Sequence, residues 1–275
     1  MSKDIPVLVI EAGRSERHYW RDLWTYRELF VFLAWRDILV RYKQTVIGVA
    51  WSVIRPVATM VVFTIVFGRI AKLPSEGVPY PLLVFSAMLP WHFFASAIAE
   101  GSNSLIENAN IISKVYFPRL IVPASAVVVS FVDFLISLAL LAVLMTWYQF
   151  LPSPRVFLLP AFLLLAILVS MGLTLLLAAL NVRYRDFRYV VPFLIQFGLL
   201  ISPVGFSLSV IPEQWRWLYS LNPMVGAIEG FRWSLLPDYA LDPRALISSV
   251  LISTIVLAVG VMYFRSTERS FADII

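Results

Sequence analysis

Long apolar runs alternate with short polar segments along most of the chain. The first 45 residues mix charged and aromatic side chains, and from Val46 onwards runs of mainly apolar residues recur. A helix needs about 20 apolar residues to cross the hydrocarbon core of a bilayer, and each run is near or above that length. The pattern predicts six membrane-spanning helices, at 46–69, 79–99, 119–145, 156–181, 189–211 and 245–264.

Prolines inside these spans indicate how the helices are organised. A proline kink within a bilayer is tolerated only where neighbouring protein satisfies the freed carbonyl group. The prolines in question are Pro56, Pro90, Pro123, Pro160, Pro192 and Pro203. They favour a packed all-α bundle, a polytopic membrane protein, over independent membrane anchors.

Composition agrees with a membrane protein. Hydrophobic residues make up 60% of the chain and charged residues 14%, whereas soluble domains carry about 25% charged residues. The net charge of +5 does not indicate a nucleic-acid partner, because the basic residues flank apolar runs, as in membrane insertion. Cysteine is absent, which excludes disulfides and thiolate metal sites.

The Lys and Arg distribution predicts the orientation. Six spans place both termini on one side, and a cytoplasmic N-terminus puts 15 of the 22 basic residues in inner segments and 6 in outer ones. The short turn 183–188, which carries three arginines, weighs most in this rule. A phosphate-binding role for this turn is the less favoured interpretation. We therefore expect an inner-membrane protein with cytoplasmic segments 1–45 and 265–275.

The segment before the first span interleaves arginines with tryptophans, which is typical of a helix lying in the membrane–water interface. An ordinary cytosolic helix is the alternative. The segment leads into the basic junction Arg41-Tyr42-Lys43. The candidate residues of this interface helix and of the cytoplasmic entrance are Arg36, Arg41, Lys43, Trp51 and Arg55.

The inner segment 101–118 predicts a short helix between spans two and three. Ser104 and Glu107 have the spacing of a capping box, which starts a helix at about 105–115. Leu105 and Ile112 would need an apolar cover from the bilayer or a partner. A solvated turn is the alternative.

The outer segment 212–244 is aromatic and too short for clean spans. Asn222-Pro223 is a turn signal between two stretches of helical character. We expect two short re-entrant helices here, whose ends are shielded by protein. Glu229 and Arg232, three residues apart, are expected to pair on one helix face.

Asp133 lies near the middle of the third span, where a carboxylate costs about 3 kcal/mol and is therefore a functional candidate. Counting along the helices places Arg55 about 10 Å deep and Asp133 about 22 Å deep, which argues against a direct bridge. Asp133 is expected to bond Ser130 or Ser137, or to line a wet pathway. Glu100, nearer the depth of Arg55, is expected to pair with it.

Aromatic residues recur within the spans at helical spacing. Helix packing is the usual role of such residues, and stacking on the apolar faces of sugar rings is the alternative. With Asp133, the candidates for lining a pathway are Phe63, Phe67, Trp91, Phe94, Phe193 and Phe197.

Sequence motifs for catalysis are missing. No Gly-Lys-Ser/Thr phosphate-binding loop occurs, so the chain is not expected to bind ATP itself. A membrane-embedded glycosyl or acyl transferase would need converging acids. The outer acids are scattered along the sequence at Glu76, Glu213, Glu229, Asp238 and Asp242, which disfavours that class.

Taken in order, several motifs resemble the membrane subunit of ABC-2 type polysaccharide exporters, the O-antigen and teichoic-acid permeases, over nearly the whole chain. They are Trp35-Arg36-Asp37, Arg41-Tyr42-Lys43 with Gly48, Trp51 and Pro56, Lys114-Val115-Tyr116-Phe117-Pro118-Arg119, Arg183-Tyr184-Arg185-Asp186, and Asn222-Pro223.

The resemblance implies a non-catalytic channel subunit that forms a homodimer over two copies of a separate ATPase, which holds ATP and Mg. The cargo would be a lipid-linked polysaccharide, with O-antigen, teichoic acid, capsule, a drug or a small lipid left open. The coupling helix would carry Ser104, Leu105, Glu107, Ile112 and Lys114. The outer gate would carry Asn222, Pro223, Glu229 and Arg232.

Overall fold

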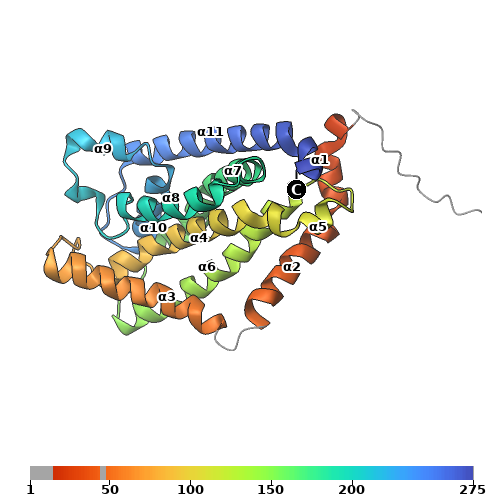
Figure 1. The fold of residues 1–275 in the computed structure, drawn as a ribbon. Coiled ribbons are helices and arrows are strands. Elements are labelled where there is room, and N and C mark those ends of the chain that lie inside the picture. Colours follow the sequence, from red (N-terminus) through yellow and green to blue (C-terminus); the bar gives the residue numbers. More distant parts are fainter. Residues whose placement is uncertain (1–14, 44–47, 275) are drawn as a thin grey trace, which may run out of the picture.

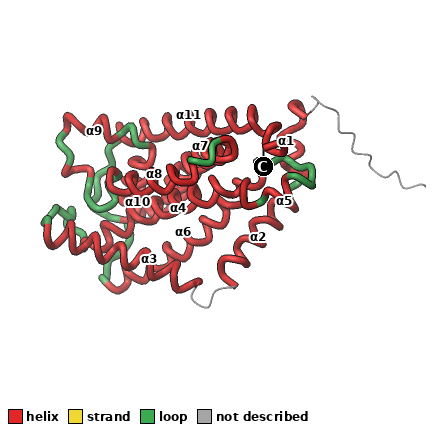
Figure 2. The backbone as a smooth tube through the Cα atoms, viewed as in Figure 1, coloured by secondary structure: helices red, strands yellow, loops and turns green. Residues whose placement is uncertain are grey.

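The computed structural model describes residues 15–43 and 48–274, and within these ranges the chain forms helices joined by loops, without strands (Figure 2). The longest helices run roughly along one direction, so the molecule has two ends (Figure 1). One end carries α1 (Ser15–Thr25), α5 (Ala109–Ile112) and the C-terminus, and the other carries α9 (Glu213–Tyr219). The predicted role of residues 1–14 lies outside the described residues.

Within the described residues, five helices are long and apolar enough to cross a membrane. α2 (Arg27–Lys43) precedes them, and α8 (Phe187–Ile201) and α10 (Pro223–Leu235) are shorter. The five are α3 (Gly48–Phe63) with its continuation η1 (Thr64–Ile70), α4 (Tyr80–Glu107), α6 (Ile121–Trp147), η2 (Pro154–Leu158) with α7 (Leu159–Arg183), and α11 (Pro243–Thr267) with η4 (Glu268–Ser270). The remaining elements are η3 (Leu208–Val210) and α12 (Phe271–Ile274).

α4 is the central helix of the bundle. In its most apolar stretch 78% of the residues are buried by the rest of the chain, against 11% for α3 and 22% for α11. In that stretch its side chains are mainly apolar on all sides, as expected where neighbours cover most of the helix. α6, α7 and α10 pack directly against it. At about 1.5 Å per residue its 28 residues extend about 42 Å, more than the hydrocarbon thickness.

The fifth predicted span, 189–211, is not one continuous helix. α8 ends at Ile201 after 15 residues, about 22 Å, which is short of the ~30 Å hydrocarbon core. Pro203 explains the end, because proline lacks an amide hydrogen and disfavours a helical residue before it, here Ser202. The turn that follows is buried. The prediction of six full-length spans is thus not confirmed.

The predicted capping box at Ser104 is wrong. α4 continues through Ser104 to Glu107, and the Ser104 hydroxyl donates to the Gly101 carbonyl at 2.7 Å inside the helix. α4 also continues through Gly101. A glycine is needed at this position because the helix packs so closely on Thr174 of α7 that a Cβ atom would clash. The short helix is α5, a single turn that begins after Asn108.

A second apolar cluster holds the end of the bundle that carries α1 and α5. Leu105 and Ile112 point into it, and their apolar cover comes from the chain itself. The cluster joins α2, α4, α5, α7, α11 and α12 through Leu33, Leu105, Ile112, Phe117, Leu175, Phe264 and Phe271.

Two glycines allow α7 and α11 to approach closely. A Cβ atom at Gly172 would lie 2.7 Å from Leu257 Cα, and one at Gly260 would overlap the Gly172 carbonyl. Small residues at such crossings let helix backbones touch in membrane proteins.

We expect Gly260→Val to separate α7 from α11 and to lower stability by about 3 kcal/mol, because the overlapped atoms are backbone. Thermal unfolding of the purified protein would measure the loss. Val259→Ala, at the neighbouring half-exposed position, is the matched control and should leave the unfolding temperature unchanged. Equal stability of the two variants would contradict the close helix contact.

Candidate functional site

A polar cluster lies where the end of α2 meets the middle of the bundle. Arg41 Nη2 lies 2.6 Å from Asp133 Oδ2 of α6, and Arg41 Nη1 pairs with Glu100 of α4. Tyr42 donates to Asp133 Oδ1 at 2.5 Å, and Ser52 of α3 donates to the same oxygen at 3.2 Å. One guanidinium therefore joins two carboxylates from different helices.

The sequence predictions for these acids were wrong in their partners. Ser130 bonds Ser96, with 3.2 Å between the hydroxyl oxygens, and not Asp133. Glu100 pairs with Arg41 instead of Arg55, whose side chain is exposed. The sequence predicts an interface helix before the first span, and a helix at the membrane surface would not reach acids inside the spans. The bundle places α2 alongside α6, which brings Arg41 and Tyr42 to Asp133 (Figure 1).

The Tyr42 hydroxyl acts as a hydrogen-bond donor. Burial, followed by its bond to Asp133, raises the pKa of Tyr42 above the ordinary value. The hydroxyl therefore keeps its proton and donates a hydrogen bond to the carboxylate without adding charge to the cluster, in which Arg41 faces two acids.

α2 is attached a second time, nearer the cytoplasmic end predicted for the bundle. Arg36 donates to Asn108 Oδ1 at 2.8 Å, and Asn108 Nδ2 donates to the Ser104 carbonyl at 2.8 Å. A pocket of about 540 Å³ lies between these contacts and the Arg41 cluster, with Glu107 on its wall. α2 is thus held to α4 by charged side chains at both of these places.

The predicted coupling residues divide into two groups. Ser104, Leu105 and Ile112 are buried, while Glu107 and Lys114 are exposed. Other exposed side chains of this turn are Asn110, Ser113, Val115 and Tyr116. A protein partner would therefore meet the exposed group, and the buried group would hold the turn in shape.

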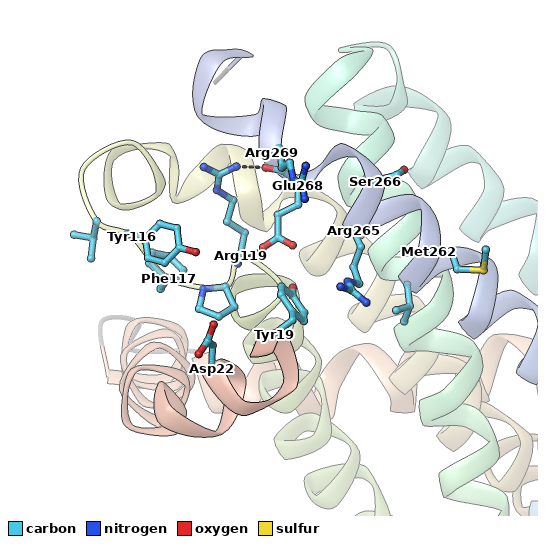
Figure 3. Close-up of a pocket in the computed structure, with 13 residues that line it drawn as sticks. Tyr19, Asp22, Tyr116, Phe117, Arg119, Met262, Arg265, Ser266, Glu268 and Arg269 are labelled. Carbon is cyan, nitrogen blue, oxygen red and sulfur yellow. Dashed lines mark hydrogen bonds between the residues drawn. The ribbon is translucent and has the colours of Figure 1, made fainter. Parts of the chain in front are cut away.

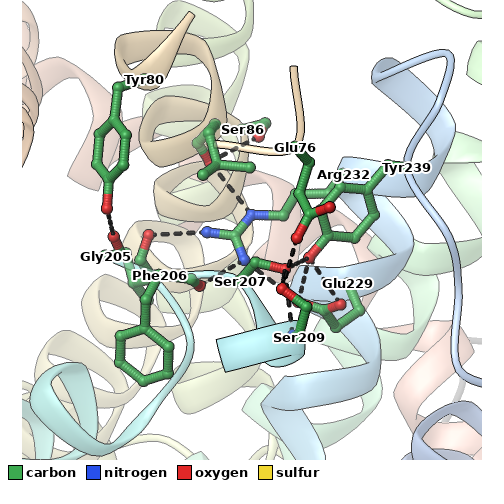
Figure 4. Close-up of polar contacts among 12 residues, drawn as sticks. Glu76, Tyr80, Ser86, Gly205, Phe206, Ser207, Ser209, Glu229, Arg232 and Tyr239 are labelled. Carbon is green, nitrogen blue, oxygen red and sulfur yellow. Dashed lines mark hydrogen bonds and ion pairs between the residues drawn. The ribbon is translucent and has the colours of Figure 1, made fainter. Parts of the chain in front are cut away.

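A second polar cluster lies at the opposite end, around Arg232 of α10 (Figure 4). Arg232 and Glu229 form the predicted ion pair at 3.2 Å, and their side chains are 0% and 2% exposed. The guanidinium also donates to three backbone carbonyls, those of Leu83 at 3.2 Å, Val204 at 3.0 Å and Phe206 at 2.8 Å. These bonds tie α10 to α4 and to the turn after α8.

Hydroxyl groups complete this outer cluster. Tyr239 donates to Glu229 at 2.9 Å and lies 3.0 Å from the Ser207 hydroxyl. Ser209 donates to Glu76 at 2.5 Å. The carboxylates of Glu229 and Glu76 therefore each have a hydrogen-bond donor.

The fold brings together three of the outer acids that are scattered in sequence. Glu76, Glu229 and Asp242 line one pocket of about 270 Å³. Glu229 forms an ion pair with Arg232. The Asp242 carboxylate accepts a hydrogen bond from the Arg244 amide at 2.9 Å and caps α11. Within the described residues no group of three or more His, Cys, Asp or Glu side chains is arranged to hold a metal ion.

Asn222 and Pro223 begin α10. The Asn222 side chain accepts the Met224 amide at 3.0 Å, and Pro223 occupies the first helical position, where a missing amide costs nothing. Asn222 also donates to the Ser202 hydroxyl at 2.9 Å, in the turn after α8. The segment 212–244 forms two short helices, α9 and α10; their re-entrance into the membrane stays a prediction.

The aromatic candidates lie in two settings. Trp91 and Phe94, with ring centroids 5.3 Å apart, are buried in the core. Phe193 and Phe197 on α8 have ring centroids 4.6 Å apart with the ring planes tilted by 36°, and they are 56% and 50% exposed. The remaining pair, Phe63 and Phe67, meets edge to face at 5.4 Å, and Trp51 is 59% exposed.

Comparison with known proteins identifies the family. The ABC-2 type transporter family matches residues 28–236, which is most of the chain and includes both polar clusters except Tyr239 and Asp242. The chain belongs to the ABC-2 type transporter family. As an ABC-2 transporter chain it is a multi-pass membrane protein, which agrees with its five long apolar helices.

Similar proteins align along nearly their whole length. This ABC-2 transporter chain is 28% identical to the O-antigen export system permease protein RfbA of Myxococcus xanthus, covering 92% of this chain and 97% of that protein. It is 26% identical to RfbA of Klebsiella pneumoniae, over 90% and 95% of the two chains. It is 23% identical to the polysialic acid transport protein KpsM of Escherichia coli, over 86% and 92%.

We expect Arg41→Gln to destabilise this ABC-2 transporter chain by about 2 kcal/mol, because it leaves two half-buried carboxylates without a cation. Adding Glu100→Gln and Asp133→Asn should restore most of the loss. Arg55→Gln, in an exposed position, is the control. Thermal unfolding measures all three proteins, and a triple variant no more stable than Arg41→Gln would contradict the charge pairing.

Arg232→Met should cost at least 3 kcal/mol, because it leaves a buried carboxylate unpaired and removes the donor of the Val204 and Phe206 carbonyls, while the Leu83 carbonyl keeps the Ser86 hydroxyl. The double variant with Glu229→Gln should recover only part of this, since the carbonyls of Val204 and Phe206 still lack the guanidinium. The unfolding temperature is the measurement, with exposed Arg244→Met as control. Full recovery of the unfolding temperature in the double variant would show that the hydrogen bonds from Arg232 to the backbone carbonyls do not stabilise the protein.

Proposed function

We propose that this chain is the membrane subunit of an ATP-driven exporter that moves a lipid-linked polysaccharide of the O-antigen class out across the cytoplasmic membrane. The observation that carries the proposal is the alignment over 92% of this chain and 97% of an O-antigen export permease. The K. pneumoniae and E. coli relatives, also named for glycan transport, align over comparable lengths.

The exposed faces of α3 and α8 support a homodimer. Both helices carry large apolar side chains that the single chain leaves uncovered, among them Val62 (54%), Phe193 (56%) and Leu200 (62%). Hydrophobic faces of this kind in a membrane protein meet lipid or another subunit. A second copy placed against α3 and α8 would set Phe193 and Phe197 along a shared pathway, where aromatic rings stack on sugar faces.

The turn after α4 is the proposed contact with two copies of a separate ATPase. It lies at the same end as the C-terminus and α1 (Figure 1). Its exposed side chains are available to a partner, whereas Ile112 fixes the turn from inside. With Arg36 bonded to Asn108, movement of the turn would also move α2, the proposed interface helix. Both termini would then be cytoplasmic.

The outer cluster is the proposed gate support. α9 and α10 lie at the far end, and Arg232 holds the buried turn between α8 and η3. Non-helical backbone at membrane depth is tolerated where protein satisfies it. Release of this turn would open the outer end of the pathway, so Arg232 sets how firmly the gate is closed.

A transferase is the second candidate and has weaker support. Three acids do share the outer pocket, but Glu229 is bound to Arg232 and Tyr239, and Glu76 to Ser209. No carboxylate of this pocket has the pairing of a general acid and base. The cargo alternatives of teichoic acid, capsule, drug or small lipid keep the same architecture.

Reconstitution tests the export function. The chain and its ATPase, placed together in proteoliposomes containing a lipid-linked O-antigen, should expose the glycan to an external lectin only when ATP is supplied. The chain without the ATPase should expose none. Glycan product formed by the chain alone would favour the transferase instead.

Charge reversal on the exposed turn tests the coupling. Lys114→Glu should lower permease-stimulated ATP turnover about tenfold, the loss of roughly 1.4 kcal/mol of contact energy. Arg185→Glu, an exposed charge reversal in the turn between α7 and α8, is the matched control. Unchanged turnover with Lys114→Glu would place the ATPase contact elsewhere. Ile112→Arg is unsuitable for this test, because Ile112 is buried.

A further inference from the structure

A pocket of about 480 Å³ opens at the end of α11, away from both polar clusters (Figure 3). Its walls come from α1, from the loop 113–120 and from the last turns of α11 with η4. Figure 3 shows Arg119, Arg265 and Arg269 gathered here around Glu268 and Tyr19. Val115 and Tyr116 on its wall also belong to the proposed coupling turn, whereas the three arginines have no part in the proposed coupling, pathway or gate.

The charge in the pocket is positive. Three arginines, Arg119, Arg265 and Arg269, face two acids, Asp22 and Glu268, which gives a net charge of +1. Glu268 is engaged by Arg119, since its Oε1 accepts the Arg119 amide at 2.7 Å and its carbonyl accepts the Arg119 guanidinium.

The Arg265 guanidinium lies over an aromatic ring and also interacts electrostatically with Glu268. Its guanidinium carbon lies 4.8 Å from the centre of the Tyr19 ring. A guanidinium stacked on a ring keeps the N–H donors at its edge available for a bidentate anion. The Tyr19 hydroxyl is buried beside Glu268 and has no hydrogen-bond partner of good geometry within the described residues.

The pocket leads directly onto an apolar stripe. Met262, on the pocket wall, is 71% exposed, and Val259 (48%), Ile255 (60%) and Leu251 (59%) continue from it along α11. From Met262 to Leu251 the helix rises about 16 Å, half of the hydrocarbon thickness. The basic pocket and the apolar stripe together match the charged headgroup and the acyl chains of a lipid in one leaflet.

We propose that this pocket binds the phosphate headgroup of an anionic phospholipid of the cytoplasmic leaflet, whose acyl chains lie along the α11 stripe. Arg265 and Arg269 bind the phosphate, and Met262 marks the passage from headgroup to acyl chain. Basic pockets between membrane helices on the cytoplasmic side are typical sites for anionic headgroups. The inference rests on the proposed orientation and is independent of the cargo.

The test is lipid retention by the full-length protein. The purified chain is incubated with phosphatidylglycerol or phosphatidylcholine, and bound lipid is counted by native mass spectrometry. We expect wild type to retain phosphatidylglycerol preferentially. Arg265→Gln and Arg269→Gln should each lower that retention about fivefold, the contribution of one basic residue at an anionic surface. Arg269 is exposed, and thermal unfolding of both variants distinguishes loss of the lipid site from loss of the fold.

Arg244→Gln, an exposed arginine at the other end of α11, is the matched control and should retain lipid like wild type. Equal retention by wild type and both pocket variants would overturn the proposal. Stabilisation by soluble glycerol phosphate equal to that by phosphatidylglycerol would overturn the role of the acyl chains. Loss of ATPase binding with unchanged lipid retention would assign the pocket to the protein partner instead.

Discussion

Backbone carbonyl groups inside an apolar bundle need hydrogen-bond donors, and beyond Ile201 the helix no longer supplies them. Proline at position 203 ends α8 about 8 Å short of the full hydrocarbon thickness. Arg232 meets this need, because its guanidinium has five donors and reaches two carbonyls of the turn and one of α4. The ion pair with Glu229 neutralises the positive charge that Arg232 brings into the bundle. A lysine has three donors at a single point and lacks the planar fork that spans these carbonyls.

The same requirement explains the inner cluster. Asp133 and Glu100 are carboxylates placed on two packed helices, and each ionised group alone would be costly at this depth. Arg41 pairs with both, so one side chain from α2 replaces two separate counter-ions. The consequence for the fold is that α2, although short and flanked by charges, cannot move away from α4 and α6 without exposing two unpaired acids.

Sequence spacing predicted the features that depend only on residues close together in the chain. The Glu229–Arg232 pair follows from a three-residue separation, and the start of α10 follows from Asn222-Pro223. Most partners of Asp133 and Arg232 could not be predicted in this way, because they lie far away in the sequence. Ser52 and Tyr42 are 81 and 91 positions from Asp133, and Leu83 is 149 positions from Arg232. The spacing of Ser104 and Glu107 misled, because the same spacing also occurs within a continuous helix, here the last turns of α4. Five of the six apolar runs gave long helices, and the sixth was shortened by a proline whose effect depends on what surrounds it.

α4 connects the two clusters. Its Leu83 carbonyl accepts Arg232 at one end, its Glu100 pairs with Arg41, and Asn108 beyond its last turn accepts Arg36. α4 is buried along most of its length, and Pro90 interrupts its hydrogen-bond ladder between Leu83 and Glu100. A push on the turn after α4 would reach the carbonyl that Arg232 holds, 25 residues before Asn108, if the helix moves as one body past Pro90. We infer that opening of the turn after α8 depends on whether Arg232 keeps its hydrogen bond to the Leu83 carbonyl while α4 moves. The Leu83–Arg232 contact would then link the two ends of the bundle.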